Sequence, residues 1–123
     1  MSEVRILVVD DYLPWHKSVV SILRQSPTMR VVGTAVNGFE ALTKLNELRP
    51  DIVLLDFEMP ILDGIQTMAE IQRLSPFTRV IFVTACDSPR FREQAFAAGA
   101  VGVVSKMHAG FRLISAIQES LEQ

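Results

Sequence analysis

Short apolar stretches alternate along this chain with segments that have the apolar spacing of a helix. The stretches are rich in Val, Ile and Leu and are continuous rather than alternating, as in strands buried on both faces of a parallel sheet. In the segments between them, apolar residues recur every three or four positions, which is typical of an amphipathic helix. The pattern predicts five strands, at residues 5–9, 31–36, 51–55, 79–83 and 101–104.

One predicted helix follows each predicted strand. A strand–helix repeat with right-handed crossovers gives a parallel sheet with helices on both faces, so the predicted fold class is α/β with a doubly wound sheet. Ser75 and Pro76 should end the third helix, and Gly99 should end the fourth in the left-handed conformation. The helices are predicted around residues 15–23, 41–48, 65–71, 91–98 and 113–121.

Polar side chains follow four of the predicted strands. Asp10 and Asp11 follow the first strand, Asp56 the third and Thr84 the fourth, and Lys106 lies just past the fifth. In an open parallel sheet, ligands bind in the crevice at the carboxyl ends of the strands. Each residue alone has an ordinary explanation, because acids cap helices, hydroxyls cap turns and lysines are solvated. Capping does not explain three carboxylates that converge with a cation and a hydroxyl, so we expect a functional site at this edge.

Three neighbouring carboxylates need a compensating positive charge, because without one at least one of their pKa values is raised. Mg2+ suits such a site, since it binds one or two carboxylates, keeps several waters and bridges to phosphate oxygens. Lys106 adds a second positive charge that can contact phosphate. A carboxylate that accepts a phosphoryl group while cations stabilise its oxygens is a known form of covalent catalysis. The residues therefore predict phosphoryl chemistry with Mg2+.

Composition narrows the class of protein further. The 123 residues, 49% hydrophobic and 21% charged, fit one globular domain over residues 1–123. The net charge of -2 argues against non-specific binding to nucleic acid. No stretch approaches the roughly 20 apolar residues of a membrane span, and the first residues lack the pattern of a signal peptide. The single cysteine, Cys86, has no partner for an internal disulfide. We therefore expect a cytoplasmic protein without a membrane partner.

The motifs at the strand ends resemble those of the receiver domain of bacterial two-component response regulators. They are "ILVVDD", "DIVLLDFEMPILDG", "VIFVTA" and "AGAVGVVSK", in this order and spacing over essentially the whole chain. The resemblance implies a flavodoxin-like fold with strand order 2-1-3-4-5 and five helices. "VVGTAVNGFEAL" and "LRPDIVLLD" resemble the subgroup whose receivers precede a helix-turn-helix DNA-binding domain. No such domain follows Gln123, so we expect a stand-alone receiver or a fragment of a longer regulator, with DNA contacted only through that further domain.

The resemblance also implies roles for the acidic residues. Asp56 resembles the phospho-acceptor of the family. Asp10 and Asp11 resemble the acidic pair that holds Mg2+ together with Asp56 and the backbone carbonyl of Glu58. The implied reaction is transfer of a phosphoryl group to Asp56 from a sensor histidine kinase or a small phosphodonor, and hydrolysis later resets the switch.

Thr84 resembles the family hydroxyl that bonds the phosphoryl group, and Lys106 the lysine that contacts it. The implied function is a phosphorylation-dependent switch in signal transduction and transcription regulation, which controls partner binding or dimerisation. Such a protein catalyses its own phosphorylation and dephosphorylation only, so it is not otherwise an enzyme. The implied partners are the sensor histidine kinase and a second copy of the chain.

Three positions depart from the family pattern. Val103 stands where the family often has an aromatic residue that turns inward, so we expect output to use the loop at residues 84–89 and the helix at 91–98 instead. Met107 stands where a proline usually follows the lysine, which predicts a differently shaped loop. Glu58 adds an acid at the rim of the site, where it would engage Lys106 or a metal-bound water, repel a phosphodonor, or simply face solvent.

Alternative functions come from other classes of protein. The main alternative is a receiver-like interaction module that works without phosphorylation, which Val103 and Glu58 favour slightly and the complete set of site residues disfavours. Flavin binding would need a phosphate-binding loop rich in Ser, Thr and Gly after the first strand, where the chain has "DDYLPW". An aspartyl-phosphate phosphatase would need a second Asp two residues after the nucleophile, where the chain has Glu58.

Overall fold

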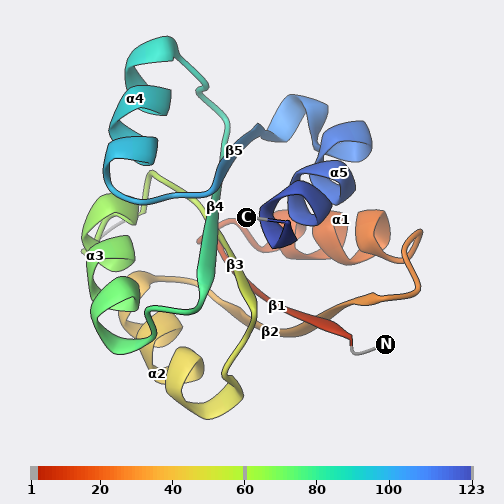
Figure 1. The fold of residues 1–123 in the computed structure, drawn as a ribbon, viewed down its shortest axis with the longest axis horizontal. Coiled ribbons are helices and arrows are strands. Elements are labelled where there is room, and N and C mark those ends of the chain that lie inside the picture. Colours follow the sequence, from red (N-terminus) through yellow and green to blue (C-terminus); the bar gives the residue numbers. More distant parts are fainter. Residues whose placement is uncertain (1–2, 60, 123) are drawn as a thin grey trace.

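A computed structural model describes residues 3–59 and 61–122 of the chain. These residues contain a five-stranded parallel sheet in the order β2-β1-β3-β4-β5, which crosses the centre of the molecule in Figure 1. The order and the parallel direction of the strands confirm the predicted flavodoxin-like α/β fold. The strands are β1 (Val4–Val9), β2 (Met29–Ala35), β3 (Ile52–Leu55), β4 (Arg79–Thr84) and β5 (Gly102–Ser105).

Helices cover both faces of the sheet, as Figure 1 shows. Each of the five predicted helices is present, and one helix follows each strand along the chain. Two helices share an apolar cluster with one face of the sheet, and three share a cluster with the other face. The first two are α1 (Leu13–Leu23) and α5 (Ala109–Leu121), and the other three are α2 (Gly38–Leu48), α3 (Gly64–Leu74) and α4 (Pro89–Ala97).

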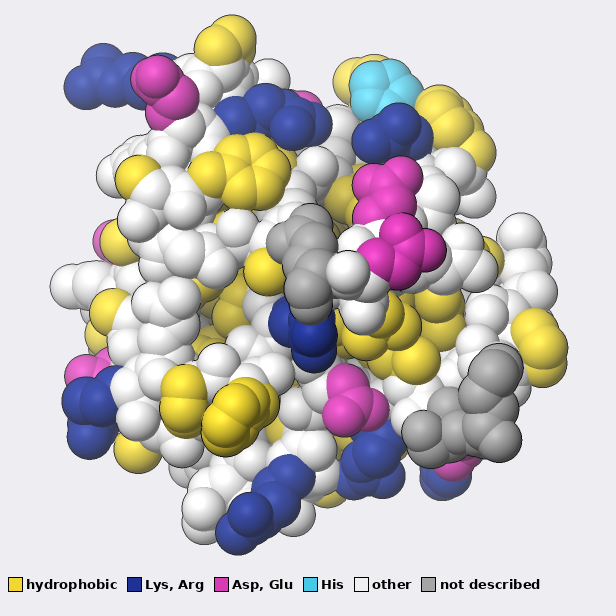
Figure 2. Space-filling model, viewed as in Figure 1, with side chains coloured by type: hydrophobic (Ala, Val, Ile, Leu, Met, Phe, Trp, Pro, Cys, Tyr) yellow, Lys and Arg dark blue, Asp and Glu magenta, His cyan; other side chains and the backbone are white. Residues whose placement is uncertain are grey.

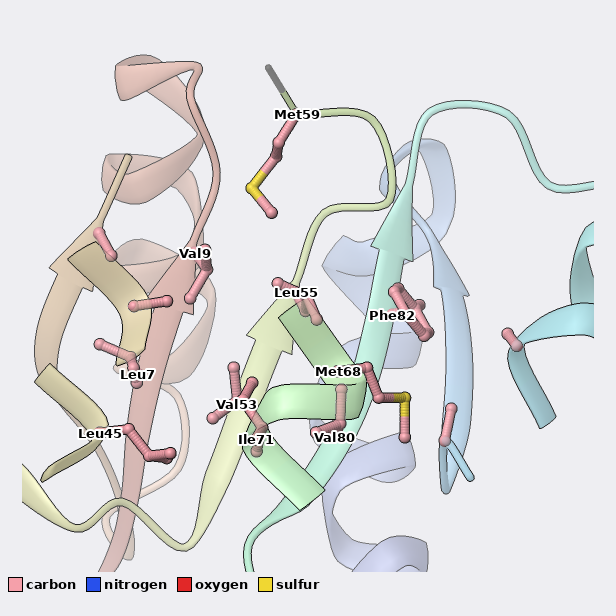
Figure 3. Close-up of a cluster of buried hydrophobic side chains, with 14 of the residues drawn as sticks. Leu7, Val9, Leu45, Val53, Leu55, Met59, Met68, Ile71, Val80 and Phe82 are labelled. Carbon is pink, nitrogen blue, oxygen red and sulfur yellow. The ribbon is translucent and has the colours of Figure 1, made fainter. Parts of the chain in front are cut away.

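Each central strand supplies side chains to both apolar clusters, because successive residues of a strand point to opposite faces. In β1, Leu7 and Val9 belong to the cluster under α2, α3 and α4, whereas Ile6 and Val8 belong to the cluster under α1 and α5. Figure 3 shows the first cluster, with Met68 of α3 among its labelled side chains. Burial of one aliphatic side chain is worth about 1.5 to 3 kcal/mol. The need to fill both faces explains why these strands are continuous apolar runs.

The bounds of β2 differ from the predicted ones. β2 begins at Met29, two residues before the predicted start, because Met29 pairs with Val4 of β1. It ends at Ala35, one residue before the predicted end. The N–H of Val36 donates instead to a carboxylate oxygen of Glu40 at 3.2 Å, so Val36 leaves the ladder for the start of α2.

The bounds of α4 also differ, because its first turn has a cap that the apolar pattern does not reveal. The Ser88 hydroxyl accepts a hydrogen bond from the N–H of Phe91 at 3.1 Å, and Pro89 occupies the first turn. The helix therefore begins at Pro89 and ends at Ala97. Gly99 follows with φ of 107°, which confirms the predicted left-handed glycine at this end.

Charged side chains of both signs are scattered among hydrophobic ones over the face seen in Figure 2. This mixture agrees with the small net charge of -2. Within residues 3–59 and 61–122, no helix has the length and apolar character that crossing a membrane requires.

Candidate functional site

Three carboxylates meet at the carboxyl edge of the sheet. Asp10 and Asp11 follow β1, and Asp56 follows the neighbouring strand β3. One side-chain oxygen from each residue lies within 4.8 Å of an oxygen of the other two. Asp10 and Asp56 are buried, with 1% and 7% of their surface exposed, whereas Asp11 is exposed. The cluster is therefore set into the sheet edge and faces solvent on the side of Asp11.

The sheet itself positions the two buried acids. The N–H of Asp10 donates to the carbonyl of Ala35 at 3.0 Å, and the N–H of Asp56 donates to the carbonyl of Val9 at 3.0 Å. Both residues thus continue the parallel ladder by one step beyond their strands. Asp56 is thus bonded to Val9, the residue before Asp10, so the sequence pattern of a strand followed by Asp brings the two side chains together.

The two carboxylate oxygens of Asp10 have different partners. Its Oδ1 accepts the N–H of Tyr12 at 2.9 Å. Its buried Oδ2 lies 2.6 Å from Nζ of Lys106 and pairs with that ammonium. One ammonium does not offset the charge of three neighbouring carboxylates. The cluster is therefore suited to a hard cation with oxygen ligands, such as Mg2+, which could share Oδ2.

The pKa of Asp56 is raised from 3.8 to about 7. Burial is the largest cause, and the negative charges of Asp10 and then Asp11 add to it. Lys106 and a hydrogen bond from the backbone N–H of Glu58 act in the opposite direction and lower the pKa. Without a further cation, the site therefore shifts Asp56 toward its protonated form. A divalent ion among the three carboxylates would favour the ionised, nucleophilic form.

Lys106 and Thr84 come from the two strands beyond β3. Lys106 begins the 3-10 turn η1 (Lys106–His108) after β5, and its ammonium lies against Asp10. Thr84 ends β4 and is buried. Its hydroxyl accepts the N–H of Cys86 at 3.1 Å and lies 3.3 Å from the carbonyl oxygen of Cys86. The structure therefore brings Lys106 to the carboxylates and bonds the Thr84 hydroxyl to its own loop.

The loop after Asp56 packs tightly against the site. The N–H of Gly64 donates to the carbonyl of Phe57 at 2.9 Å, and a Cβ on Gly64 would lie 2.7 Å from the backbone oxygen of Asp56. Only glycine allows this close approach of backbones. Met59 points back toward the sheet from the same loop in Figure 3, while Glu58 is exposed and forms no ion pair with a residue that the structure describes. Of the arrangements considered for Glu58, the structure shows the one in which it faces solvent. Lys106 pairs with Asp10 rather than with Glu58.

Two contacts of the site were missed by sequence reasoning. His16 is buried, and its Nε2 donates to the backbone carbonyl of Asp10 at 2.8 Å. Trp15 contacts the site as well, because Nζ of Lys106 lies 5.3 Å from its ring centroid. The sequence offered one signal for these contacts. Trp15 and His16 stand five and six residues after Asp10, in the first turns of the helix after β1, and this part of a helix lies beside the end of the preceding strand.

The chain belongs to the response regulator receiver domain family, whose model matches residues 6–118. Together with the fold, this match identifies a receiver domain of two-component signalling, a class of domain distinct from the families of catalytic enzymes. The match also confirms the resemblance that the strand-end motifs indicated.

Longer proteins contain regions similar to this chain. A protein-glutamate methylesterase/protein-glutamine glutaminase of Methanosarcina acetivorans is 47% identical over 105 residues, which are 84% of this chain and 29% of that protein. The response regulator GacA of Pseudomonas viridiflava is 34% identical over 115 residues, which are 94% of this chain and 54% of that protein. The chain thus spans between about a third and about half of these relatives.

Solved structures of isolated receivers are similar over almost their whole length. The response regulator domain of Thermotoga maritima CheB has a TM-score of 0.90 and 32% identity, and the similarity covers 98% of both chains. The signal receiver domain of the putative response regulator NarL from Mycobacterium tuberculosis has a TM-score of 0.90 and 33% identity, covering 99% of this chain and 98% of that one.

Proposed function

We propose that this chain is a phosphorylation-dependent switch that accepts a phosphoryl group on Asp56 in the presence of Mg2+. The observation that carries this proposal is the cluster of three carboxylates within 4.8 Å, with the ammonium of Lys106 against it. Acids that only face solvent would not need to lie this close to one another and to an ammonium. Two of the acids are buried at real cost, and the ammonium of Lys106 offsets only one of the three negative charges.

The proposed ligands of Mg2+ are the carboxylates of Asp10, Asp11 and Asp56 and the backbone carbonyl of Glu58. When bound, the ion would supply positive charge that keeps the acceptor ionised and offsets the charge of the phosphoryl oxygens. The chain itself contributes the acidic cluster that could hold such an ion. The excess of three carboxylates over the one ammonium of Lys106 that lies against them supports this assignment.

The proposed reaction is an in-line transfer to the Asp56 carboxylate. One carboxylate oxygen attacks phosphorus and forms a P–O bond while the P–N bond of a donor phosphohistidine breaks, and the leaving imidazole keeps the electron pair and takes a proton. Lys106 supplies positive charge to the phosphoryl oxygens, and the Thr84 hydroxyl, released from its own loop, donates a hydrogen bond to one of them. Attack by water later cleaves the acyl phosphate and restores Asp56.

The proposed partners follow from the class of domain. Receiver domains interact with histidine kinases and with effector domains, so a sensor histidine kinase in the cytoplasm is the proposed phosphodonor. The proposed output is a change in partner binding or in dimerisation. If the chain is part of a longer regulator, as GacA is longer than its receiver region, the switch would act on the attached domain and so on transcription.

Intact mass measurement after incubation with Mg2+ and acetyl phosphate tests the proposal. We expect the unaltered chain to gain the mass of one phosphoryl group and to lose it again on standing. Asp56→Asn should gain none, because an amide nitrogen or oxygen does not form a stable acyl phosphate.

Asp51→Asn is the matched control, since Asp51 precedes β3 at the opposite end of the strand from Asp56. This variant should gain the phosphoryl group at the rate of the unaltered chain. Absence of any gain in the unaltered chain, or an equal gain in Asp56→Asn, would contradict the proposal and favour an interaction module that works without phosphorylation.

A further inference from the structure

We propose that Trp15 is a positioning residue for Lys106: its indole face holds the ammonium beside Asp10, ready for a phosphoryl group on Asp56. The catalytic consequence rests on the proposed function. The contact itself is a property of the free protein and can be tested without Mg2+ or phosphodonor.

Lys106 has two partners of different kinds. Its Nζ lies 2.6 Å from Oδ2 of Asp10 and 5.3 Å from the ring centroid of Trp15. A cation within about 6 Å of an aromatic centroid is attracted by the negative face of the ring, most strongly with Trp. The ammonium therefore bridges the buried carboxylate and the indole.

The contacts of Lys106 with Asp10 and with Trp15 would respond differently to a divalent cation bound at the acidic cluster. The ion pair with Asp10 uses the same oxygen that a divalent cation would take, so cation binding competes with it. The indole carries no charge and is not a ligand for a hard cation, so its hold on Lys106 is not in competition. Trp15 would keep the ammonium near the carboxylates after Asp10 turns to the metal.

Trp15 is itself held firmly. It lies in the first turn of α1, and only 9% of its surface is exposed. Its backbone N–H donates to the carbonyl of Tyr12 at 3.0 Å. Lys106 is held less firmly, since it lies in a short 3-10 turn and its side chain is 20% exposed. A lysine has about 2 kcal/mol of rotamer entropy, so a rigid partner reduces the number of positions that the ammonium samples.

The kinetic test compares three residues at position 15. We expect Trp15→Leu to lower the rate of phosphorylation by acetyl phosphate between about twofold and about thirtyfold, which corresponds to cation–π energies of about 0.5 to 2 kcal/mol. Trp15→Phe keeps an aromatic face that attracts cations less strongly, so its rate should lie between the two.

The same exchange in a Lys106→Met background separates a positioning role of Trp15 from a packing role. In Lys106→Met, exchange of Trp15 for Leu should change the phosphorylation rate by less than twofold, because no ammonium remains to be positioned. A purely structural role of Trp15 would instead lower the rate in both backgrounds, and Phe would rescue neither. Either result would overturn the proposal. Circular dichroism checks that each variant folds.

Fluorescence emission tests the contact in the free protein, because Trp15 is the only tryptophan in the sequence. Without Mg2+ and phosphodonor, Lys106→Met should shift the emission maximum of Trp15. Lys17→Met, which removes an exposed lysine from the same helix, should leave it unchanged. Identical emission of the unaltered chain and Lys106→Met would overturn the proposal. If the unaltered chain accepts no phosphoryl group, the proposed function fails, and this emission comparison still decides whether Trp15 holds Lys106.

Discussion

At the scale of single residues, the raised pKa of Asp56 links the charge of the site to the stability of the protein. The pKa is about 7 in the folded chain and 3.8 in the ordinary case. Between these values the folded protein binds a proton that the unfolded chain has lost. The free energy of unfolding therefore falls as pH rises from about 4 to about 7, and the contribution of Asp56 is fully unfavourable above that range.

Asp56→Asn should remove this pH dependence. In chelator, urea unfolding of the unaltered chain should give a lower free energy at pH 8 than at pH 5, by on the order of a few kcal/mol for this residue. The variant should lose less, because an amide carries no charge to bury, and it should be the more stable protein at pH 8. Other carboxylates titrate in both proteins, so the difference between the two is the measure. Equal loss in both proteins would mean that Asp56 is ionised at pH 5.

Residue types and their order predicted the acidic part of the site. Asp10 and Asp56 come together because each follows one of two neighbouring strands, a relation that the sequence contains. The contacts of Trp15 and His16 with the site depend on how α1 is rotated on the sheet. Apolar spacing gives the buried side of a helix but not which buried residue meets a strand end, so these contacts required the structure.

At the scale of elements, an aromatic cluster packs α4 against the loop after Asp56 and against β4. Phe91 of α4 packs edge-on against Phe57 at 4.6 Å and against Phe82 of β4 at 5.7 Å between ring centroids. Phe57 follows Asp56 directly. Val103 of β5 has no ring, so this cluster, rather than an aromatic residue at position 103, connects the loop after Asp56 with α4.

Phe91→Ala should loosen α4 and destabilise the fold. Phe91 is 7% exposed, so the lost burial and the cavity should cost about 3 kcal/mol or more in urea unfolding. Phe96→Ala, on the same helix but 47% exposed, is the matched control and should cost less than about 1 kcal/mol. Similar costs for the two variants would show that the aromatic cluster does not fasten the helix.

Element boundaries were less predictable than element types. The continuous apolar runs identified all five strands, since strands buried on both faces must be apolar throughout. The first turn of α4 was missed because it starts with the polar cap Ser88 and with Pro89, which carry no apolar period. The early start of β2 follows from pairing with Val4, a relation between distant segments that local patterns do not contain.

At the scale of the whole molecule, the fold was predictable because every strand is followed by its helix and the connections are short. The topology places all carboxyl ends of the strands at one edge, so the polar residues of four short motifs were expected at one site. The state of that site could not be read from the sequence in the same way. Hydrogen bonding of the Thr84 hydroxyl within its own loop and the exposure of Glu58 depend on loop conformation.

Mg2+ should stabilise the whole molecule if the acidic cluster binds it. At a concentration a hundred times the dissociation constant, a ligand specific for the folded state adds about 2.7 kcal/mol to the free energy of unfolding. We expect a matching rise in the thermal midpoint that excess chelator reverses. Asp11→Asn should lose most of the rise, because it removes a ligand from the solvent side of the cluster, whereas Asp51→Asn should keep it. A rise of equal size in Asp11→Asn would locate the bound ion elsewhere.

The burial of Asp56 also makes metal binding at the acidic cluster sensitive to pH. Its raised pKa favours a bound proton on a carboxylate that the proposed ion would need in its ionised form. Protons and the ion therefore compete for the cluster, and the apparent affinity for the ion weakens as the solution becomes more acidic. If Asp56 accepts a phosphoryl group as proposed, acidification would slow that reaction too, with no further residue needed to sense pH.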